Sequence, residues 1–323
     1  MGTRLPTTIK HKNAKPKKLN IILFDFNSIL VDVIKELHAR GHNIISGEVT
    51  PNKLKKADVV VLWNETPMGG WDKAIKKMGL DGKRTVLMQH GRRGTSRIYP
   101  PFNEPLKSDI ICAWSENDRK RLEKCNVAPQ RIRVTGTTVF NHLQPRKAHA
   151  GINVVFSPEH WDIDVVENFI VNSQLAKLKG VKVISKLLEG EHTQGVYQNP
   201  VWSDRRVQGH LEICAEVLST ADVVVAVSES TFELCAQILD IPVVIADIWT
   251  PKACNGDERY REYTREYSNA CHRVKDMSKL NEAVMYAIAH PEHLREERKH
   301  IAIDDGGTHL NSLEEICKVI EGQ

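Results

Sequence analysis

The sequence predicts an α/β protein built from two Rossmann-like, doubly wound domains that face each other across a cleft. The chain has 323 residues, which is more than one hydrophobic core usually supports. Short apolar runs alternate with helix-like segments, which is the pattern of parallel sheets covered by helices. This alternation stops once, at the polar segment 141–151, and then begins again. We therefore place one domain on each side of that segment.

The first domain is expected over residues 19–145. Its predicted strands are short runs of Ile, Val and Leu at 19–26, 58–64, 84–90, 109–115 and 131–136. Runs of this kind are buried on both faces in parallel sheets. The segment 29–41 repeats apolar residues at helical spacing and closes on a glycine, and Ser115 precedes Asp118 by three residues in a capping-box pattern. Helices are therefore expected between the strands.

The second domain is expected over residues 151–300, followed by a C-terminal helix in 301–323. Its predicted strands lie at 152–158, 181–185, 221–228 and 241–247. The long polar segment 186–210 contains three glycines and one proline, which is typical of a functional loop rather than a structural connection. No internal sequence repeat is apparent, so the two halves are predicted to share an architecture without sharing a sequence.

Residues 1–18 form a basic tail that we expect to be disordered. The tail carries lysines at positions 10, 12, 15, 17 and 18, although the net charge of the whole chain is only +4. Such a run of like charges serves either as a solubilising extension or as an attraction for a polyanion such as nucleic acid. No apolar run approaches the ~18 residues of a membrane span, and no signal peptide is apparent. We therefore expect a cytoplasmic protein without a membrane span.

One strand-like run, 84–90, ends in a histidine that is followed by a cluster of positive charge. The run closes on Gln89 and His90, and the next residues of interest are Gly91, Arg92, Arg93 and Arg97. Ligands of open parallel sheets bind at the carboxyl ends of the strands, where helix amino termini also converge. Arginine binds phosphate in a bidentate manner, although each arginine alone fits a solvated surface role equally well. The segment predicts contacts to an acceptor or to phosphate.

The predicted strand 221–228 runs into a hydroxyl-rich turn that begins a helix. The turn reads Ser228, Glu229, Ser230, Thr231, and Glu233 follows Ser230 by three residues. Hydroxyls and backbone amides at a helix start form a cradle for phosphate, and Glu233 can complete a capping box from Ser230. The alternative is a helix that is merely capped, because this spacing of serine and glutamate is common. We predict that Ser228, Ser230, Thr231 and Glu233 bind donor phosphates.

Several short segments, spread over about residues 19–320, carry a resemblance to one group of enzymes. They are the hydroxyl turn with its following Leu-x-x-Pro-Val strand, the strand end Met88–Gly91, and the segments Arg133–Asn141, Val154–Asp162 and Asp304–Ile316. In this order and these places they resemble the motifs of the CDP-glycerol glycerophosphotransferase, polysialyltransferase and UDP-GlcNAc 2-epimerase-like group of GT-B enzymes.

The resemblance implies a GT-B fold whose second domain binds a donor linked to UDP or CDP and whose first domain presents the acceptor. It implies that His90, the strand-end histidine, is the general base, a role that suits a neutral imidazole. It also implies a donor-phosphate role for Lys186. The sequence departs from the group where Ser228 replaces the usual aspartate, where Lys-x-His-Pro is incomplete after Ser185, and where the epimerase signature Asp-Ser-Gly-Gly is missing.

We expect no metal ion and no cofactor besides the nucleotide-sugar donor. Asp162 and Asp164 match the metal-binding Asp-x-Asp of another glycosyltransferase fold, but here they begin a predicted helix, where acidic residues complement the helix dipole. The seven cysteines are scattered without metal-binding spacing, which argues against a zinc site or a disulfide framework. Trp202, Arg205 and Arg206 are candidates either for contact with a nucleotide base or for packing.

The sequence thus predicts a metal-independent, inverting glycosyltransferase that moves a sugar from a nucleotide-activated donor to a hydroxyl acceptor. The lysines of the tail and the arginines beside His90 favour an anionic polymer as acceptor, such as a phosphorylated glycan or a hydroxylated base in DNA. Three alternatives stay open: a CDP-glycerol-type glycerophosphotransferase, a UDP-GlcNAc 2-epimerase-like enzyme, and a nonenzymatic nucleic-acid-binding protein.

Overall fold

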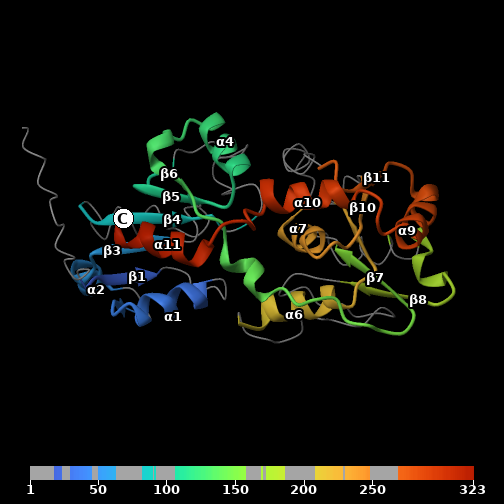
Figure 1. Ribbon diagram of the computed structural model, residues 1–323, viewed down its shortest axis with the longest axis horizontal. Coiled ribbons are helices and arrows are strands. Elements are labelled where there is room, and N and C mark those ends of the chain that lie inside the picture. The colour runs from blue at the N-terminus through green and yellow to red at the C-terminus, as the bar shows by residue number, and fades with distance from the viewer. Residues whose placement is uncertain are drawn as a thin grey trace, which may run out of the picture.

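The computed structural model shows an α/β chain arranged in two lobes that lie side by side (Figure 1). The first lobe is built around the sheet of the N-terminal half, and the second around the sheet of the C-terminal half. The residues that the structure describes are 18–23, 30–45, 50–62, 82–89, 91, 106–157, 169, 172–185, 208–227, 230–247 and 268–323.

The first lobe contains a parallel sheet of short apolar strands. They are β1 (Asn20–Leu23), β2 (Asn43–Ile45), β3 (Val59–Leu62), β4 (Arg84–Met88), β5 (Ile110–Ala113) and β6 (Ile132–Val134). Within the described part of the chain their spatial order is β2-β1-β3-β4-β5-β6, and every neighbouring pair is parallel. The chain therefore starts inside the sheet and winds outward in both directions.

The second lobe repeats this winding with its own parallel sheet. Its strands are β7 (Ile152–Ser157), β8 (Val181–Ser185), β9 (Val223–Ala226), β10 (Val243–Ala246) and β11 (His272–Val274). Their order is β11-β10-β9-β7-β8, so the first strand again lies between the second and the third. Both lobes are therefore doubly wound, and each has a reversal of strand order beside its first strand.

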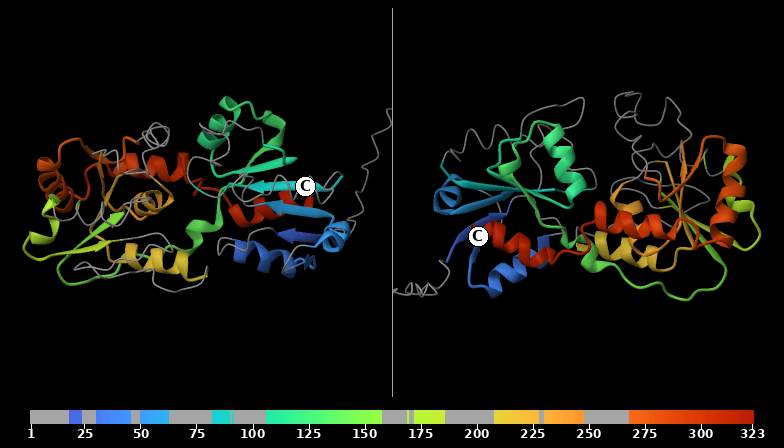
Figure 2. Two further views of the ribbon diagram at one scale, coloured as in Figure 1. Left: turned by 180° about the vertical axis from the view of Figure 1, so that it is seen from behind. Right: turned by 45° about the horizontal axis from the view of Figure 1, so that its top comes forward.

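Helices cover both faces of each sheet (Figure 2). They are α1 (Val31–Ala39), α2 (Pro51–Lys56), α4 (Glu116–Lys124), α6 (Gln208–Ser219), α7 (Thr231–Ile238), α9 (Leu280–Ala289), α10 (Arg295–Asp304) and α11 (Ser312–Glu321), with 3₁₀ turns η3 (Pro129–Arg131), η4 (Thr138–His142), η5 (Leu175–Lys177) and η7 (Met277–Lys279). In the first lobe, α1 and α11 cover one face and α2 and α4 the other. In the second, α6 and α7 cover one face and α9 the other. Among these helices none is long and apolar enough to cross a membrane.

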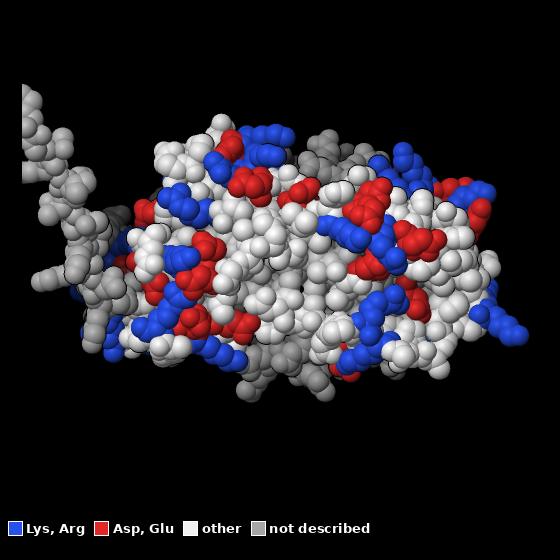
Figure 3. Space-filling view, in the orientation of Figure 1, with Lys and Arg blue, Asp and Glu red and all other residues white. Residues whose placement is uncertain are grey.

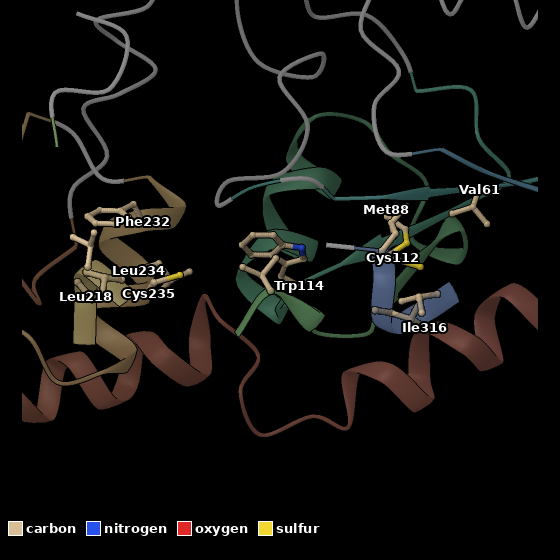
Figure 4. Close-up of a cluster of buried hydrophobic side chains, with 14 of the residues drawn as sticks. Val61, Met88, Cys112, Trp114, Leu218, Phe232, Leu234, Cys235 and Ile316 are labelled. Atoms are coloured by element: carbon tan, nitrogen blue, oxygen red, sulfur yellow. The ribbon is translucent and has the colours of Figure 1, made fainter. Parts of the chain in front are cut away.

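One apolar core runs through both lobes on the same side of the two sheets. Adjacent residues of a strand enter different cores, as Ile21 and Ile22 do in β1, because side chains alternate across a sheet. Trp114, after β5, and Phe232, in α7, belong to the shared core, and Figure 4 shows Trp114 between the side chains of the two lobes. Phe140, in η4, packs edge to face on Trp114 with ring centroids 5.6 Å apart. Burial of this continuous surface holds the lobes together on that side.

Each sheet has the same kind of polar contact at the amino end of its central strands. Asp58, just before β3, accepts hydrogen bonds from the backbone and side-chain amides of Asn20 at 2.8 and 3.3 Å. Asp222, just before β9, accepts one from the backbone amide of Asn153 at 2.8 Å. The equivalent strands of the two lobes are thus fixed by equivalent aspartates. This correspondence is visible in the structure although the sequence shows no apparent repeat.

The last helix, α11, lies on the first lobe although it follows the second lobe in sequence. Ile316 and Ile320 are buried in the core beside the first sheet. Arg84, at the start of β4, donates hydrogen bonds to the carbonyl groups at the end of α11. The chain therefore passes between the lobes twice, first in 135–151 and again in 305–311 (Figure 1). We call the second passage, residues 305–311, the crossover.

The cysteines of the described residues are free thiols, and most of them lie in the cores. Cys112, Cys235, Cys271 and Cys317 are buried. Burial raises the pKa of the Cys112 thiol to about 12 and that of the Cys317 thiol to about 12 as well. Thiols with so little thiolate at neutral pH act as small core residues and not as nucleophiles.

Candidate functional site

The carboxyl end of β4 and the start of α7 meet at the junction between the lobes. A Cβ atom built on Gly91 would lie 3.3 Å from Oγ1 of Thr231, which is closer than most Cβ contacts in proteins. Gly91 follows the first sheet, and Thr231 follows β9 of the second sheet. The structure therefore brings together one residue from each of the two segments that the sequence analysis selected. We call this contact the junction.

The start of α7 is closed by a complete capping box. The Ser230 backbone N–H donates to Oε2 of Glu233 at 2.7 Å, and the Ser230 hydroxyl lies 2.5 Å from the same oxygen. The Phe232 N–H donates to Oγ of Ser230 at 3.3 Å. The predicted capping box is therefore confirmed. These bonds occupy the Ser230 hydroxyl, and the Glu233 side chain is fully buried, whereas Thr231, the first residue of α7, is half-buried.

The turn before α7 follows the strand at the topological switch point of the second sheet. There β7 lies between β8 and β9, and Ser157 pairs in register with Ala226. In doubly wound sheets, the crevice outside such a point is where ligands bind. The Ser157 hydroxyl is buried here, with no hydrogen-bond partner within the described part of the chain. The fold therefore places Ser157 beside the carboxyl end of β9 at this switch point.

Gln89 holds the end of β4. Its side chain is buried, and both of its polar atoms make hydrogen bonds. Its Oε1 accepts from the Trp114 backbone N–H at 3.0 Å, and its Nε2 donates to the Gly91 carbonyl at 2.7 Å and to Oδ2 of Asp118 at 2.9 Å. The indole N–H of Trp114 donates back to the Gln89 carbonyl at 2.9 Å. A residue with all of these bonds fixes the path of the chain immediately before and after position 90.

Asp118, in α4, is a carboxylate with only 1% of its surface exposed. Besides the bond from Gln89, it accepts from the Ser115 hydroxyl at 3.2 Å and from the Arg121 guanidinium at 2.9 Å. Burial raises the pKa of the Asp118 carboxyl, and the Arg121 charge and the Gln89 amide oppose that rise. Ser115 caps α4 by accepting from the Asp118 N–H, so the predicted helix start is confirmed and its aspartate serves a buried network as well.

The same network reaches the crossover through Asp305. The Arg121 guanidinium lies 3.5 Å from Oδ1 of Asp305, and the Asn117 amide donates to that oxygen at 3.0 Å. Asp305 is itself buried, at 3% exposure. Two residues later, Gly307 packs its backbone on that of Trp114. Residues from β4, α4 and the crossover therefore form one continuous set of polar contacts beside the junction.

Many of the residues selected from the sequence lie outside the described residues. These are His90, Arg92, Arg93, Arg97, Asp162, Asp164, Lys186, Trp202, Arg205, Arg206 and Ser228. Their site roles stay predictions from the sequence. Of the selected set, the structure describes Gly91, Ser230, Thr231 and Glu233. Within the residues it describes, no group of three His, Cys, Asp or Glu side chains is placed to hold a metal ion.

The sequence analysis missed Gln89, Arg121 and Asp305 as parts of the site. Gln89 stood in the strand-end motif, but the histidine beside it drew the chemical interpretation. Arg121 is one of several charged residues in α4 and, like Asp305, is indistinguishable in sequence from a solvated helix residue. A glutamine buried at a strand end requires a hydrogen-bond partner, and a charged residue on an adjacent helix can supply it. This pairing is the signal that could have found these residues.

Comparisons with known proteins place the chain in a structural group. It resembles the wall teichoic acid polymerase TagF (13% identity, TM-score 0.59, covering 98% of this chain and 90% of that one). It also resembles UDP-GlcNAc 2-epimerase from Neisseria meningitidis bound to UDP-GlcNAc (12%, 0.55, 94% and 99%) and S. aureus MnaA with UDP (11%, 0.60, 94% and 96%). No protein-family model matches the sequence, and no curated protein matches it at a significant level.

These neighbours are GT-B proteins of the group that the sequence resembles, and each is covered over nearly its whole length. At such low identity the likeness shows the fold alone. The chain therefore has the GT-B fold, with two parallel, doubly wound sheets, and this prediction from the sequence is confirmed.

Proposed function

We propose that the chain is a glycosyltransferase that uses a nucleotide-sugar donor. The observation that supports this most directly is the approach of Gly91 to Thr231, 3.3 Å from a built Cβ to the hydroxyl oxygen. It places the residue after His90 at the start of the helix that follows the switch point of the second sheet. A base from one lobe and a phosphate-binding helix start from the other are what transfer between two bound substrates requires.

In this proposal the first lobe holds the acceptor, and His90 accepts the proton of its hydroxyl group. The acceptor oxygen forms a bond to the anomeric carbon while the bond from that carbon to the diphosphate oxygen breaks. The proton ends on the imidazole, and the nucleoside diphosphate leaves with the electron pair. Such a single displacement inverts the anomeric carbon. Arg92, Arg93, Arg97 and Lys186 are proposed to contact phosphate.

The leaving diphosphate would bind at the start of α7, beside Thr231 and Ser228. The partial positive charge of a helix amino terminus and a nearby hydroxyl group stabilise a phosphate anion without a metal ion. Ser230 and Glu233 support this site from behind, because their capping box fixes the direction of the first helical turn. No cofactor other than the donor is needed for this chemistry.

The variant Thr231→Ala is expected to weaken binding of the nucleoside diphosphate. A hydroxyl bond to a charged phosphate contributes roughly 1.5–3 kcal/mol, which is about 10- to 150-fold in the dissociation constant. The measurement is calorimetric titration with UDP and CDP. Thr50→Ala is the control, since Thr50 caps α2 at a distance from the junction and its loss affects only helix stability. Unchanged affinity in Thr231→Ala would exclude the hydroxyl as a phosphate ligand.

The acceptor is proposed to be anionic, as the sequence predicts from its lysine tail and from the arginines after His90. Those residues lie outside the described part of the chain. On the face shown in Figure 3, acidic and basic side chains are interspersed over both lobes, with a largely uncharged band between them. The proposal of a phosphorylated glycan or of DNA carrying a hydroxylated base therefore rests on the sequence alone.

A second candidate is an enzyme like the UDP-GlcNAc 2-epimerases, which is favoured by the likeness to the Neisseria enzyme. An epimerase converts one nucleotide sugar without an acceptor. Incubation with UDP-GlcNAc alone, followed by separation of the nucleotide sugars, would therefore distinguish the two activities. A CDP-glycerol-type glycerophosphotransferase would instead consume CDP-glycerol and leave UDP-sugars unchanged.

A thermal-shift screen with UDP, CDP and ADP tests the proposed function as a whole. A ligand at 100 times its dissociation constant stabilises the folded state by about 2.7 kcal/mol, so a bound diphosphate raises the melting temperature. We expect UDP or CDP to raise it and ADP to have little effect. If no diphosphate raises it, the chain is not a nucleotide-sugar enzyme. Salt-dependent binding of DNA in that case would favour the nonenzymatic nucleic-acid-binding alternative.

A further inference from the structure

Apolar packing in the cores does not account for the buried polar contacts beside the junction. They begin at the Gly91 carbonyl, pass through Gln89 and Asp118 to Arg121, and end at Asp305 in the crossover. Two of these contacts join distant segments of the chain: Gln89 bonds to Asp118 in α4, and Arg121 of α4 pairs with Asp305 in the crossover. A buried carboxylate costs free energy unless it is paired and hydrogen-bonded, so the fold retains this one at a cost that an apolar residue would avoid.

We propose that Asp118 is a positioning residue: through Gln89 it sets Gly91 against Thr231, and through Arg121 it ties the first lobe to the crossover. The inference rests on the proposed function only in treating the junction as the place of reaction. Its structural content, which is the alignment of the segment after β4 with the start of α7, stands on the described contacts themselves.

Hydrogen bonds from both ends of its side-chain amide fix the orientation of Gln89. Its amide nitrogen has two hydrogens, one for the Gly91 carbonyl at 2.7 Å and one for Asp118 at 2.9 Å. Its amide oxygen is occupied by the Trp114 N–H. If the Asp118 carboxylate is removed, one amide hydrogen is left buried without an acceptor. A rotation of the amide toward another acceptor then releases Gly91.

Arg121 links the first lobe to the crossover and so to the second lobe. Arg121 lies between two buried carboxylates, 2.9 Å from Asp118 and 3.5 Å from Asp305. Asp305 follows directly on α10, and α10 is fastened to the end of α7 because Arg298 donates to Asp240 at 2.9 and 2.6 Å. A path of contacts thus runs from Asp118 through the crossover and α10 to the helix that carries Thr231.

The junction is sensitive to small movements. A Cβ on Gly91 would already lie 3.3 Å from the Thr231 hydroxyl, so the segment after β4 and the start of α7 are close to contact. In a reaction between two bound substrates, a displacement of about 1 Å can lower the rate by about 10²-fold. A residue that fixes this alignment therefore affects turnover more than it affects the binding of either substrate.

Disulfide trapping measures the alignment without any nucleotide. In the double variant Gly91→Cys, Thr231→Cys, a sulfur replaces the Thr231 oxygen near the new Cβ, which suits a disulfide. We expect this variant to form the cross-link under mild oxidation, and addition of Asp118→Ala to slow its formation about tenfold or more. Asp118→Asn, which keeps one acceptor oxygen, should give an intermediate rate.

The matched control is Asp109→Ala in the same double-cysteine background. Asp109 also holds β4 by its carboxylate, accepting from the Thr85 N–H at 2.7 Å, but at the opposite end of the strand. Its loss should leave the cross-linking rate unchanged. The cross-linked peptide is identified by mass spectrometry, and all rates are compared where circular dichroism shows the variants to be folded. Arg121→Gln replaces Asp118→Ala if the latter does not fold.

Equal cross-linking rates with and without the Asp118 carboxylate, in folded protein, would overturn the proposal. So would the absence of any cross-link in the parent double variant, because the junction would then not form in solution. In turnover assays without the added cysteines, Asp118→Ala should lower kcat far more than it raises KM. If the thermal-shift screen finds no bound diphosphate, the proposed function fails while the cross-linking result keeps its meaning.

Discussion

His90→Asn is expected to lower turnover by about 10²–10⁴-fold while leaving the affinity for the nucleoside diphosphate nearly unchanged. Asparagine is polar and similar in reach but does not accept a proton at neutral pH. The acceptor hydroxyl would then lose its base, whereas the diphosphate, which the proposal places at α7, would keep its contacts. Single-turnover kinetics with donor and acceptor, together with titration of UDP or CDP, separate the two effects.

His42→Asn provides the control for this measurement. His42 is a buried histidine of the same lobe whose Nδ1 accepts from the Leu19 N–H at 3.2 Å and whose Nε2 lies 2.8 Å from Glu321 in α11. Its loss should lower the stability of the first lobe and leave turnover of the folded protein intact. Wild-type turnover in a folded His90→Asn variant would mean that another group accepts the proton.

The strands in the centres of the sheets could be predicted from the sequence, and two edge strands could not. Runs such as Val59–Leu62 and Val223–Ala226 are buried on both faces, so every position is apolar and the run is recognisable. The missed strands, Asn43–Ile45 and His272–Val274, are three residues long and lie at the sheet edges. An edge strand pairs on one side only and is partly exposed, which removes the continuous apolar signal.

The caps of the candidate site were predictable, whereas its long-range contacts were not. The capping box of Ser230 and Glu233 depends on a spacing of three residues, which a sequence states directly. The contact of Gly91 with Thr231 depends on how two separately folded sheets are docked. No local pattern encodes that docking, because it follows from the shared apolar core and the crossover.

The position of the crossover could not be predicted from the sequence either, although the segment that contains it carries part of the resemblance. Asp304–Ile316 was selected for its resemblance to a C-terminal helix. In the structure, Gly307 adopts φ +60° and lies against the backbone of Trp114 in the other lobe. A glycine that permits a close approach between distant backbones looks the same in sequence as one that permits a turn.

Gly307→Ala is expected to destabilise the protein by roughly 2–5 kcal/mol, through a left-handed backbone that disfavours a Cβ and through a direct clash. The new Cβ would lie 2.1 Å from the Trp114 carbonyl oxygen and 3.2 Å from the Gly136 Cα, and both of these neighbours are backbone. Since neither can rotate away, the crossover must move off the first lobe. Urea unfolding followed by tryptophan fluorescence reports this, because Trp114 is buried at the contact.

Gly180→Ala separates the cost of a side chain on a left-handed backbone from the cost of the direct clash. Gly180 has φ +78°, but a Cβ built on it meets nothing within 4 Å, so its substitution costs only the backbone preference of about 1–2 kcal/mol. The excess loss in Gly307→Ala then measures the packing of the crossover on Trp114. Equal losses in the two variants would show that the crossover does not hold the lobes together. An excess loss should be accompanied by slower cross-linking between positions 91 and 231, since moving the crossover also withdraws Asp305 from Arg121.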